Sequence, residues 1–332
     1  MSLMPSQPNS NNLVIDRCSS ISSFDIDDNK NHQCKATLSA MLSQEKHYKS
    51  TPLRQTTANA NAKSNNMTIF RTKIFTWMMH IIETAELQRE TAIIAMSYLD
   101  RFMSTTVSQA KRARYNRREY QLISFTCLYI AIKISEPTAL SISMCSTLSR
   151  GVHSIDDIIA CEKNILKGLQ WRMNGPTPHQ FVHHMLQLLP DEDKDTSSSR
   201  SVASKVYADS QSEIEIAVED HACVSLRSST IAVAALLNSL DTVPQDTLSY
   251  DKKIHFIQVI SDTFGIDVSH SPLITACRQR FRDRSTKLLR LRRVHVVSTN
   301  QEVVQEEAAP TYKIVPASVE RSPVCASGEI TP

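Results

Sequence analysis

Glycine is scarce in this sequence, with five residues in 332. Tight-turned sheets and phosphate-gripping loops both depend on glycine, because its backbone reaches conformations that other residues avoid. Alanine, leucine, isoleucine and methionine are plentiful, and such residues favour helices. The composition therefore predicts an all-α protein without a glycine-rich nucleotide loop.

Paired cysteines and long apolar runs are also missing. None of the eight cysteines forms a C-x-x-C pair, and several lie in apolar stretches. A free cysteine in such a stretch behaves as a small hydrophobic residue, so we expect reduced thiols and an intracellular protein. No apolar run approaches the roughly 18 residues of a membrane span, and the N-terminus lacks a signal-peptide pattern. We expect neither secretion nor membrane contact.

Catalytic constellations are missing as well. His179 and His183 share a helix face beside His184, but no third metal ligand accompanies them, so we predict no metal site. No nucleophile lies near a base in any recognisable pattern, so we predict neither an enzyme nor a bound cofactor. Charge is balanced, with 37 basic and 34 acidic residues, which makes nucleic acid an unlikely partner.

The pattern of apolar residues predicts a first bundle around residues 90–104. From Ala92 to Phe102 apolar side chains cover every side of a helix, and a helix of this kind belongs inside a bundle. Ser154 is expected to cap a helix that ends at Gly168. The stretch 105–118 is expected to be a basic linker, which is either a solvated loop or a contact for an anion or a partner. The predicted helices of this first domain are 67–86, 90–104, 120–134, 140–148 and 155–168.

A second domain is predicted to begin at the capping box formed by Thr177 and Gln180, with proline between them. Its helices are expected at 178–189, 202–219, 225–240, 250–264 and 272–293. The fold is therefore two tandem five-helix domains, 67–175 and 176–294. Segments 1–36 and 295–332 are expected to be disordered tails. Segment 37–66 holds a short amphipathic helix and a linker, and this helix is expected to dock on its own bundle or on a partner.

Three ionic residues do not fit a purely apolar bundle. Asp100 ends the second helix of the first domain, and Arg71 is its expected partner in a bidentate ion pair between helices. Lys133 ends a helix that is apolar nearly all round. Glu162 lies within the apolar stripe predicted to face the core from the helix 155–168, formed by Ile155, Ile158, Ile159, Leu166 and Leu169. Internal salt bridges would satisfy them, or they could grip the backbone ends of a partner's helix at one edge of the bundle.

These residues resemble the cyclin family. Four motifs agree in identity, order and helix placement: Arg71 six residues before Trp77, the sequence Leu-Asp-Arg-Phe at 99–102, the sequence Ala-Ile-Lys-Ile-Ser-Glu at 131–136, and Glu162 nine residues before Trp171. The stretches 95–102 and 178–181 are most similar to D-type (G1) cyclins. The resemblance implies two cyclin boxes.

The resemblance also implies a function. The chain would be a regulatory subunit that activates a cyclin-dependent serine/threonine kinase in G1 or G1/S control, with kinase substrates or inhibitors as further partners. Lys133, Glu162 and Glu136 would contact the kinase. A transcription-associated cyclin or a cyclin-fold transcription factor is the alternative.

A substrate-docking patch is implied at Phe70, Ile74, Trp77, Tyr120 and Gln121. Lys73 stands where the family usually has an apolar residue and His80 where it often has an acid, which counts against docking of basic motifs. Thr51, Ser322 and Thr331 each precede a proline and could be phosphorylated. The basic tract 278–293 could be a nuclear import signal or the solvated face of the last helix, and a nuclear protein that also occurs in the cytoplasm is expected.

Overall fold

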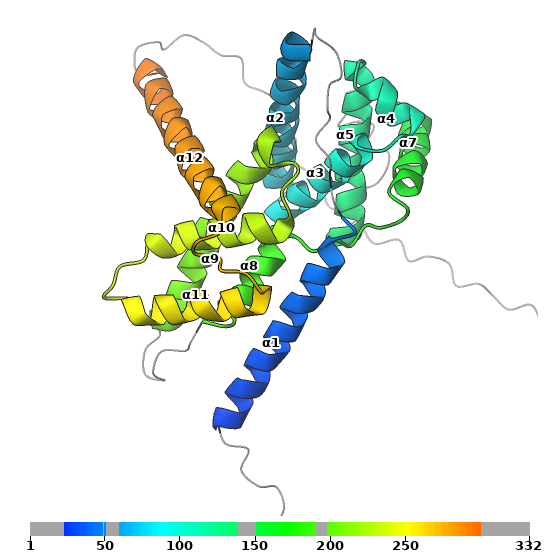
Figure 1. Ribbon diagram of the computed structural model, residues 1–332. Helices are drawn as coiled ribbons and strands as arrows, with labels where there is room; N and C mark the ends of the chain where they lie inside the picture. Colours follow the sequence, from blue (N-terminus) through cyan, green and yellow to red (C-terminus); the bar gives the residue numbers. More distant parts are fainter. Residues whose placement is uncertain (1–22, 49, 51–59, 138–150, 190–197, 300–332) are drawn as a thin grey trace, which may run out of the picture.

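The computed structural model describes residues 23–48, 50, 60–137, 151–189 and 198–299. Every regular element within these ranges is helical (Figure 1), as predicted. None of the described helices is long and apolar enough to cross a membrane. The predicted helix 140–148 lies outside the described residues.

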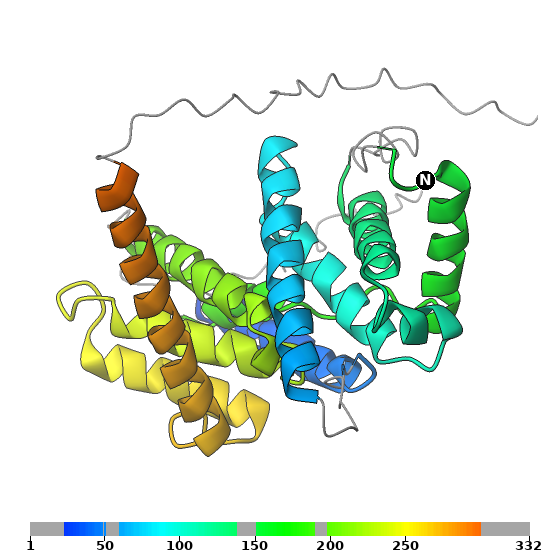
Figure 2. The ribbon, with the colours of Figure 1, turned by 90° about the horizontal axis from the view of Figure 1, so that it is seen from above.

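Two helical bundles follow one another along the chain (Figures 1 and 2). The first bundle contains α2 (Ala60–Thr84), α3 (Arg89–Met103), α4 (Ser108–Ala113), α5 (Arg117–Ser135) and α7 (Ile155–Gly168). The second contains α8 (Pro178–Leu186), α9 (Ser198–Glu219), the short 3-10 helix η1 (His221–Cys223), α10 (Ser228–Asp241), α11 (Tyr250–Phe264) and α12 (Pro272–Thr299). Each bundle has its own apolar core.

Helix α3 is the centre of the first bundle, and its central apolar residues are buried, as the sequence indicated. The predicted cap at Ser154 and the predicted capping box at Thr177 are both present, and the structure contains a full capping box at each. Ser154 accepts a hydrogen bond from the Asp157 amide at the start of α7, and Thr177 accepts one from the Gln180 amide at the start of α8. These caps satisfy amides that would otherwise lack partners at the helix N-termini.

The first helix, α1 (Ser23–Glu45), belongs to the second bundle. Its residues Cys34, Leu38 and Met41 are buried in the second core, and α1 packs on α8 and α11. The Glu45 carboxylate accepts hydrogen bonds from the amide and the hydroxyl of Ser229, at the start of α10. Of the two expected docking places, α1 therefore occupies the chain's own bundle.

Several predicted boundaries were wrong. Helix α1 begins at Ser23, inside the tail that was expected to be disordered, and α12 continues to Thr299. Helix α2 begins at Ala60, inside the expected linker, and α4 interrupts the loop expected at 105–118. The three longer helices share a physical reason: once packing has nucleated a helix, each further residue adds a hydrogen bond at little cost. Helix α4 forms because Ala110 and Ala113 are buried in the first core.

Gly168 is the last residue of α7, and it does not adopt the left-handed conformation of a glycine C-cap. A Cβ atom at this position would lie 2.8 Å from Cε2 of Phe102. Close packing of α7 on α3 therefore explains this glycine.

All five described cysteines, at positions 34, 127, 161, 223 and 277, are free and buried. Burial raises the pKa of Cys161 to about 12 and that of Cys223 to about 12. At neutral pH the thiols of Cys161 and Cys223 therefore stay protonated, and both residues pack as small apolar groups.

Candidate functional site: an interdomain ion pair and a charged edge

Arg71 and Asp100 form the predicted ion pair between α2 and α3. Arg71 Nε donates to Asp100 Oδ1 over 2.9 Å, and Nη2 donates to Oδ2 over 2.6 Å. The two side chains are 5% and 14% exposed. Burial by itself would lower the pKa of Arg71, but the Asp100 carboxylate outweighs it and holds that pKa above its usual value.

Arg71 also reaches into the second bundle. Its Nη1 donates to the backbone oxygens of Val218 and Glu219 over 2.6 and 3.1 Å. These carbonyls lie in the last turn of α9, where helix geometry leaves them without partners inside the helix. One guanidinium thus joins both domains, and we call Arg71, Asp100 and the end of α9 the interdomain clasp. Sequence reasoning found the ion pair but not the second domain's part in it.

Lys133 and Glu162 lie at one edge of the first bundle, where α5 and α7 meet. Lys133 Nζ donates to Glu162 Oε1 over 3.1 Å. The Lys133 side chain is 54% exposed and that of Glu162 is 15% exposed. The hydrogen bond to Glu162 raises the pKa of Lys133. The two residues lie together at this edge and are each other's ionic partner, which is the internal salt bridge that the sequence left open as one of two alternatives.

Exposed isoleucines surround this pair. Ile134 follows Lys133 on α5, and Ile155 and Ile159 lie on α7 about two turns and one turn before Glu162. They are 44%, 40% and 48% exposed. The prediction that Ile155 and Ile159 face the core was wrong, because Ile158, Cys161 and Ile165 form the buried side of α7. We call Lys133, Ile134, Ile155, Ile159 and Glu162 the α5/α7 edge.

Glu136 accepts hydrogen bonds from residues of its own chain. Its Oε1 accepts hydrogen bonds from the backbone amide of Gln88 and from the hydroxyl of Thr91, at the start of α3. A carboxylate in this position stabilises a helix N-terminus. The structure therefore places Glu136 as a brace between α5 and α3, whereas the resemblance implied a contact with a partner.

The five residues of the implied docking patch come together where α2 meets α5. The Phe70 and Tyr120 rings are 5.2 Å apart, and Trp77 lies 5.9 Å from the ring of Phe125. Ile74 and Tyr120 are buried, whereas Phe70, Trp77 and Gln121 are half-buried. Burial raises the pKa of Tyr120, so its hydroxyl stays protonated.

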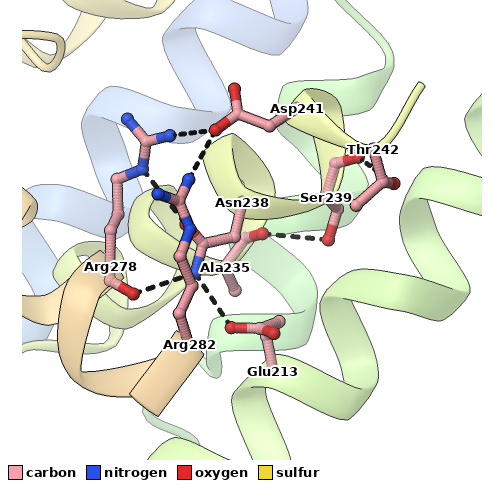
Figure 3. Close-up of polar contacts among 8 residues, drawn as sticks. All are labelled: Glu213, Ala235, Asn238, Ser239, Asp241, Thr242, Arg278 and Arg282. Carbon is pink, nitrogen blue, oxygen red and sulfur yellow. Dashed lines mark hydrogen bonds and ion pairs between the residues drawn. The ribbon is translucent and has the colours of Figure 1, made fainter. Parts of the chain in front are cut away.

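The basic tract at 278–293 is partly committed to ion pairs on α12. Arg278 and Arg282 both donate to Asp241 Oδ2 over 2.5 Å, and Arg278 also contacts Asn238 (Figure 3). Arg280 and Arg284 lie on the other side of α12 and pair with Asp220. The first half of the tract therefore braces α12 against α10 and against the residue that follows α9.

The histidines do not form a metal site. His179 is buried and neither of its ring nitrogens makes a hydrogen bond, while His183 and His184 both contact Gln187. In the described part of the chain, no cluster of three potential metal ligands occurs. Thr51, Ser322 and Thr331 lie outside the described residues.

Comparison with known proteins agrees with the family resemblance of the four sequence motifs. The family profile described as "Cyclin, N-terminal domain" matches residues 37–174. The mouse protein named G1/S-specific cyclin-D1 is 26% identical over 188 residues, which are 55% of this chain and 59% of that protein. The zebrafish protein of the same name is 27% identical over 237 residues, or 70% of this chain and 75% of the relative. The match to the mouse protein thus spans less than two thirds of its length.

Among solved structures, a viral cyclin from herpesvirus saimiri has a TM-score of 0.51 and 19% sequence identity. The similarity covers 66% of this chain and 85% of the viral protein. At this level of identity, the likeness concerns the fold alone.

Proposed function

This chain belongs to the cyclin family, and from that premise we propose that it binds and activates a cyclin-dependent serine/threonine kinase. In this role it is a regulatory subunit and carries out no chemistry itself. The observation that carries the proposal is the α5/α7 edge, where an exposed ion pair lies among exposed isoleucines. Exposed apolar residues beside such a pair are typical of a surface that another protein covers.

The edge can bind the unpaired backbone groups at one end of a partner helix and in the segment next to that end. The last carbonyls of a helix lack partners and carry partial negative charge, which suits the ammonium group of Lys133. Unpaired amides in the segment next to that end suit the carboxylate of Glu162 for the same reason. Lys133 is 54% exposed, so opening this pair costs less than opening a buried one, and the cost for a fully exposed pair is about 0–1 kcal/mol. The pair between Lys133 and Glu162 can therefore open at little cost, and both side chains can bind the kinase instead. The isoleucines then bury apolar area against the kinase.

The test is a reversal of the ion pair. We expect Lys133→Glu and Glu162→Ala each to weaken kinase binding by about tenfold or more, because a charge at the interface loses its partner. The double variant Lys133→Glu/Glu162→Lys re-forms the internal pair with opposite polarity. It should fold like the wild type and still fail to bind. Co-purification of the bound kinase, followed by an activity assay at equal concentrations, measures both quantities.

Two results would count against this mechanism. If the double variant recovers wild-type binding, the pair only stabilises the fold. If both single variants activate the kinase like the wild type, the edge is not the contact surface. Identifying the co-purified kinase would also separate a cell-cycle cyclin from a transcription-associated one.

We further propose action in G1 or at the G1/S transition. The likeness to proteins named G1/S-specific cyclin-D1, at 26–27% identity, supports this narrower role. Depleting the protein from synchronised cells should delay entry into DNA replication. A delay only at mitosis would contradict the G1 role.

A nuclear location remains a proposal. The ion pairs of α12 narrow the part of the basic tract that could serve as the import signal. Because the arginines from 278 to 284 have acidic partners, an import signal would lie in Lys287, Arg290, Arg292 and Arg293. Replacing these four with glutamine should move the protein to the cytoplasm. Unchanged nuclear accumulation would show that the tract is not a signal.

A further inference from the structure

A cavity of about 320 Å³ lies where the two bundles are joined. Its walls come from the end of α1, the start of α3, the end of α5 and the segment 173–177 that leads into α8. Gln88, Asn174 and Gln180 in these walls are exposed, so the cavity opens to solvent. Ligand sites in proteins enclose about 300–1,000 Å³, so this cavity has room for a small ligand only.

Glu90, in the first turn of α3, carries the only ionised group among the residues that line the cavity. The side chain is half-buried, and its Oε1 accepts a hydrogen bond from the hydroxyl of Thr177. Within the described residues, its Oε2 accepts no hydrogen bond and its carboxylate forms no ion pair. A half-buried negative charge therefore faces the cavity without a cation.

Basic residues near Glu90 do not supply this cation. Arg89 donates to two other carboxylates, those of Glu83 and Glu215. Burial lowers the pKa of His179, against the opposing effect of the Glu90 carboxylate, so this imidazole is neutral at pH 7. No lysine or arginine lines the cavity itself. The potential inside the cavity is therefore negative.

The rest of the wall combines apolar side chains with oxygen acceptors. Ile94, Ile134 and Met173 supply apolar groups. Gln44 donates through its Nε2 to the backbone oxygen of Asn174 over 2.9 Å, which leaves the Oε1 of Gln44 as an acceptor. Such a wall suits a ligand with an aliphatic stem and N–H donors at its ends.

We infer that this cavity binds a small aliphatic diamine. One ammonium group pairs with Glu90, the stem packs against Ile94 and Met173, and the second ammonium group donates to the amide oxygen of Gln44. An anion would be repelled by Glu90, and a neutral ligand would gain the apolar contact without the ion pair. The inference concerns the chain alone, so it can hold even where activation of a kinase fails.

The experiment uses the full-length chain and three ligands with carbon chains of equal length: 1,5-diaminopentane, 1,5-pentanediol and glutarate. We expect isothermal titration calorimetry at low salt to detect the diamine with a dissociation constant of about 1 mM. Its affinity should fall as salt rises, because a charge on the wall attracts it. The diol and glutarate should bind at least about fivefold more weakly.

Matched variants locate the binding. Glu90→Gln removes the charge and keeps an oxygen that can accept from Thr177, and it should weaken diamine binding by about fivefold or more. Glu86→Gln makes the same change at an exposed residue between α2 and α3, outside the cavity, and should leave binding intact. Ile94→Phe keeps the charge but occupies part of the cavity, so it should weaken binding as well. Circular dichroism checks that all three variants fold.

Four outcomes would overturn the inference. The first is the absence of detectable diamine binding to the wild type. The second is equal affinity for the diol and the diamine, which would mean that the cavity does not recognise charge. The third is an equal loss in Glu90→Gln and Glu86→Gln, which would indicate a general charge effect. The fourth is unchanged binding to Ile94→Phe, which would place the diamine outside the cavity.

Discussion

Two ion pairs in the first domain have similar chemistry and opposite surroundings. Arg71–Asp100 is buried, and its arginine also binds two carbonyl oxygens of the second domain. Lys133–Glu162 lies at an edge, with its lysine more than half exposed and with no second acceptor among its hydrogen bonds in the described residues. The buried pair is suited to hold two domains together, and the exposed pair is suited to exchange partners.

Desolvation explains the difference. A buried charge has lost its water, so removing its partner leaves it uncompensated at a cost of about 3–5 kcal/mol. The two pairs differ in the cation, because Lys133 is 54% exposed and Arg71 is 5% exposed, whereas Glu162 and Asp100 are 15% and 14% exposed. An exposed cation recovers water when its pair opens, and fully exposed pairs contribute about 0–1 kcal/mol. The same kind of contact is therefore permanent in one place and replaceable in the other.

The largest expected effect comes from breaking the clasp. Arg71→Met leaves Asp100 and the end of α9 without their donor, and we expect it to lower the free energy of unfolding by about 3–5 kcal/mol. Because Arg71 joins the domains, urea unfolding should also separate into two transitions. Arg112→Met removes an exposed pair with Glu119 and serves as the control. Equal destabilisation by the two variants would contradict the role of the clasp.

Acid should weaken the clasp region. His221 lies on η1 near Arg71. Burial lowers the pKa of His221 most, and the positive charge of Arg71 lowers it further. The carboxylates of Asp100 and Asp220 oppose this shift without cancelling it. The unfolded chain, with a histidine pKa of about 6.5, then takes up the proton first as pH falls below that value, so the folded state loses stability. Since His221 is only half-buried, we expect about 1 kcal/mol or less between pH 7 and pH 5.5.

Urea midpoints across this pH range measure the effect. His221→Gln should reduce the loss of stability, whereas His255→Gln, at an exposed position on α11, should leave it as in the wild type. A pH dependence unaltered by His221→Gln would rule out this histidine as its source.

The smallest expected effect on stability concerns the ion pair at the edge, Lys133–Glu162. Lys133→Met should lower the free energy of unfolding by about 1 kcal/mol, well below the loss in Arg71→Met. The reason is that Lys133 is 54% exposed and joins no second domain, although Glu162, at 15% exposed, loses its partner. Thermal unfolding of the chain alone measures this value. If the same variant also loses most of its kinase binding, the Lys133–Glu162 pair serves binding and the Arg71–Asp100 pair serves stability. A loss as large as that of Arg71→Met would contradict the distinction.

Sequence reasoning succeeded where local rules apply. Helix α3 and the caps at Ser154 and Thr177 follow from residues within a few positions of one another, and the structure contains them. The partners Arg71 and Asp100 were also recognised, because a charge in an apolar stripe requires a counter-charge nearby. Which side of α7 is buried was misjudged at Ile155 and Ile159, because isoleucines on two adjacent faces of a helix do not reveal which face meets the core.

The sequence by itself determined the all-α class, the division into two bundles and the places where charges interrupt apolar helices, because periodicity and capping are local properties. Only the tertiary structure decided that α1 completes the second core, that Arg71 spans both domains and that Lys133 with Glu162 stays exposed. These outcomes depend on contacts between distant parts of the chain and on the water that each contact removes. That is why two similar ion pairs, indistinguishable in a list of charges, take different roles in the folded protein.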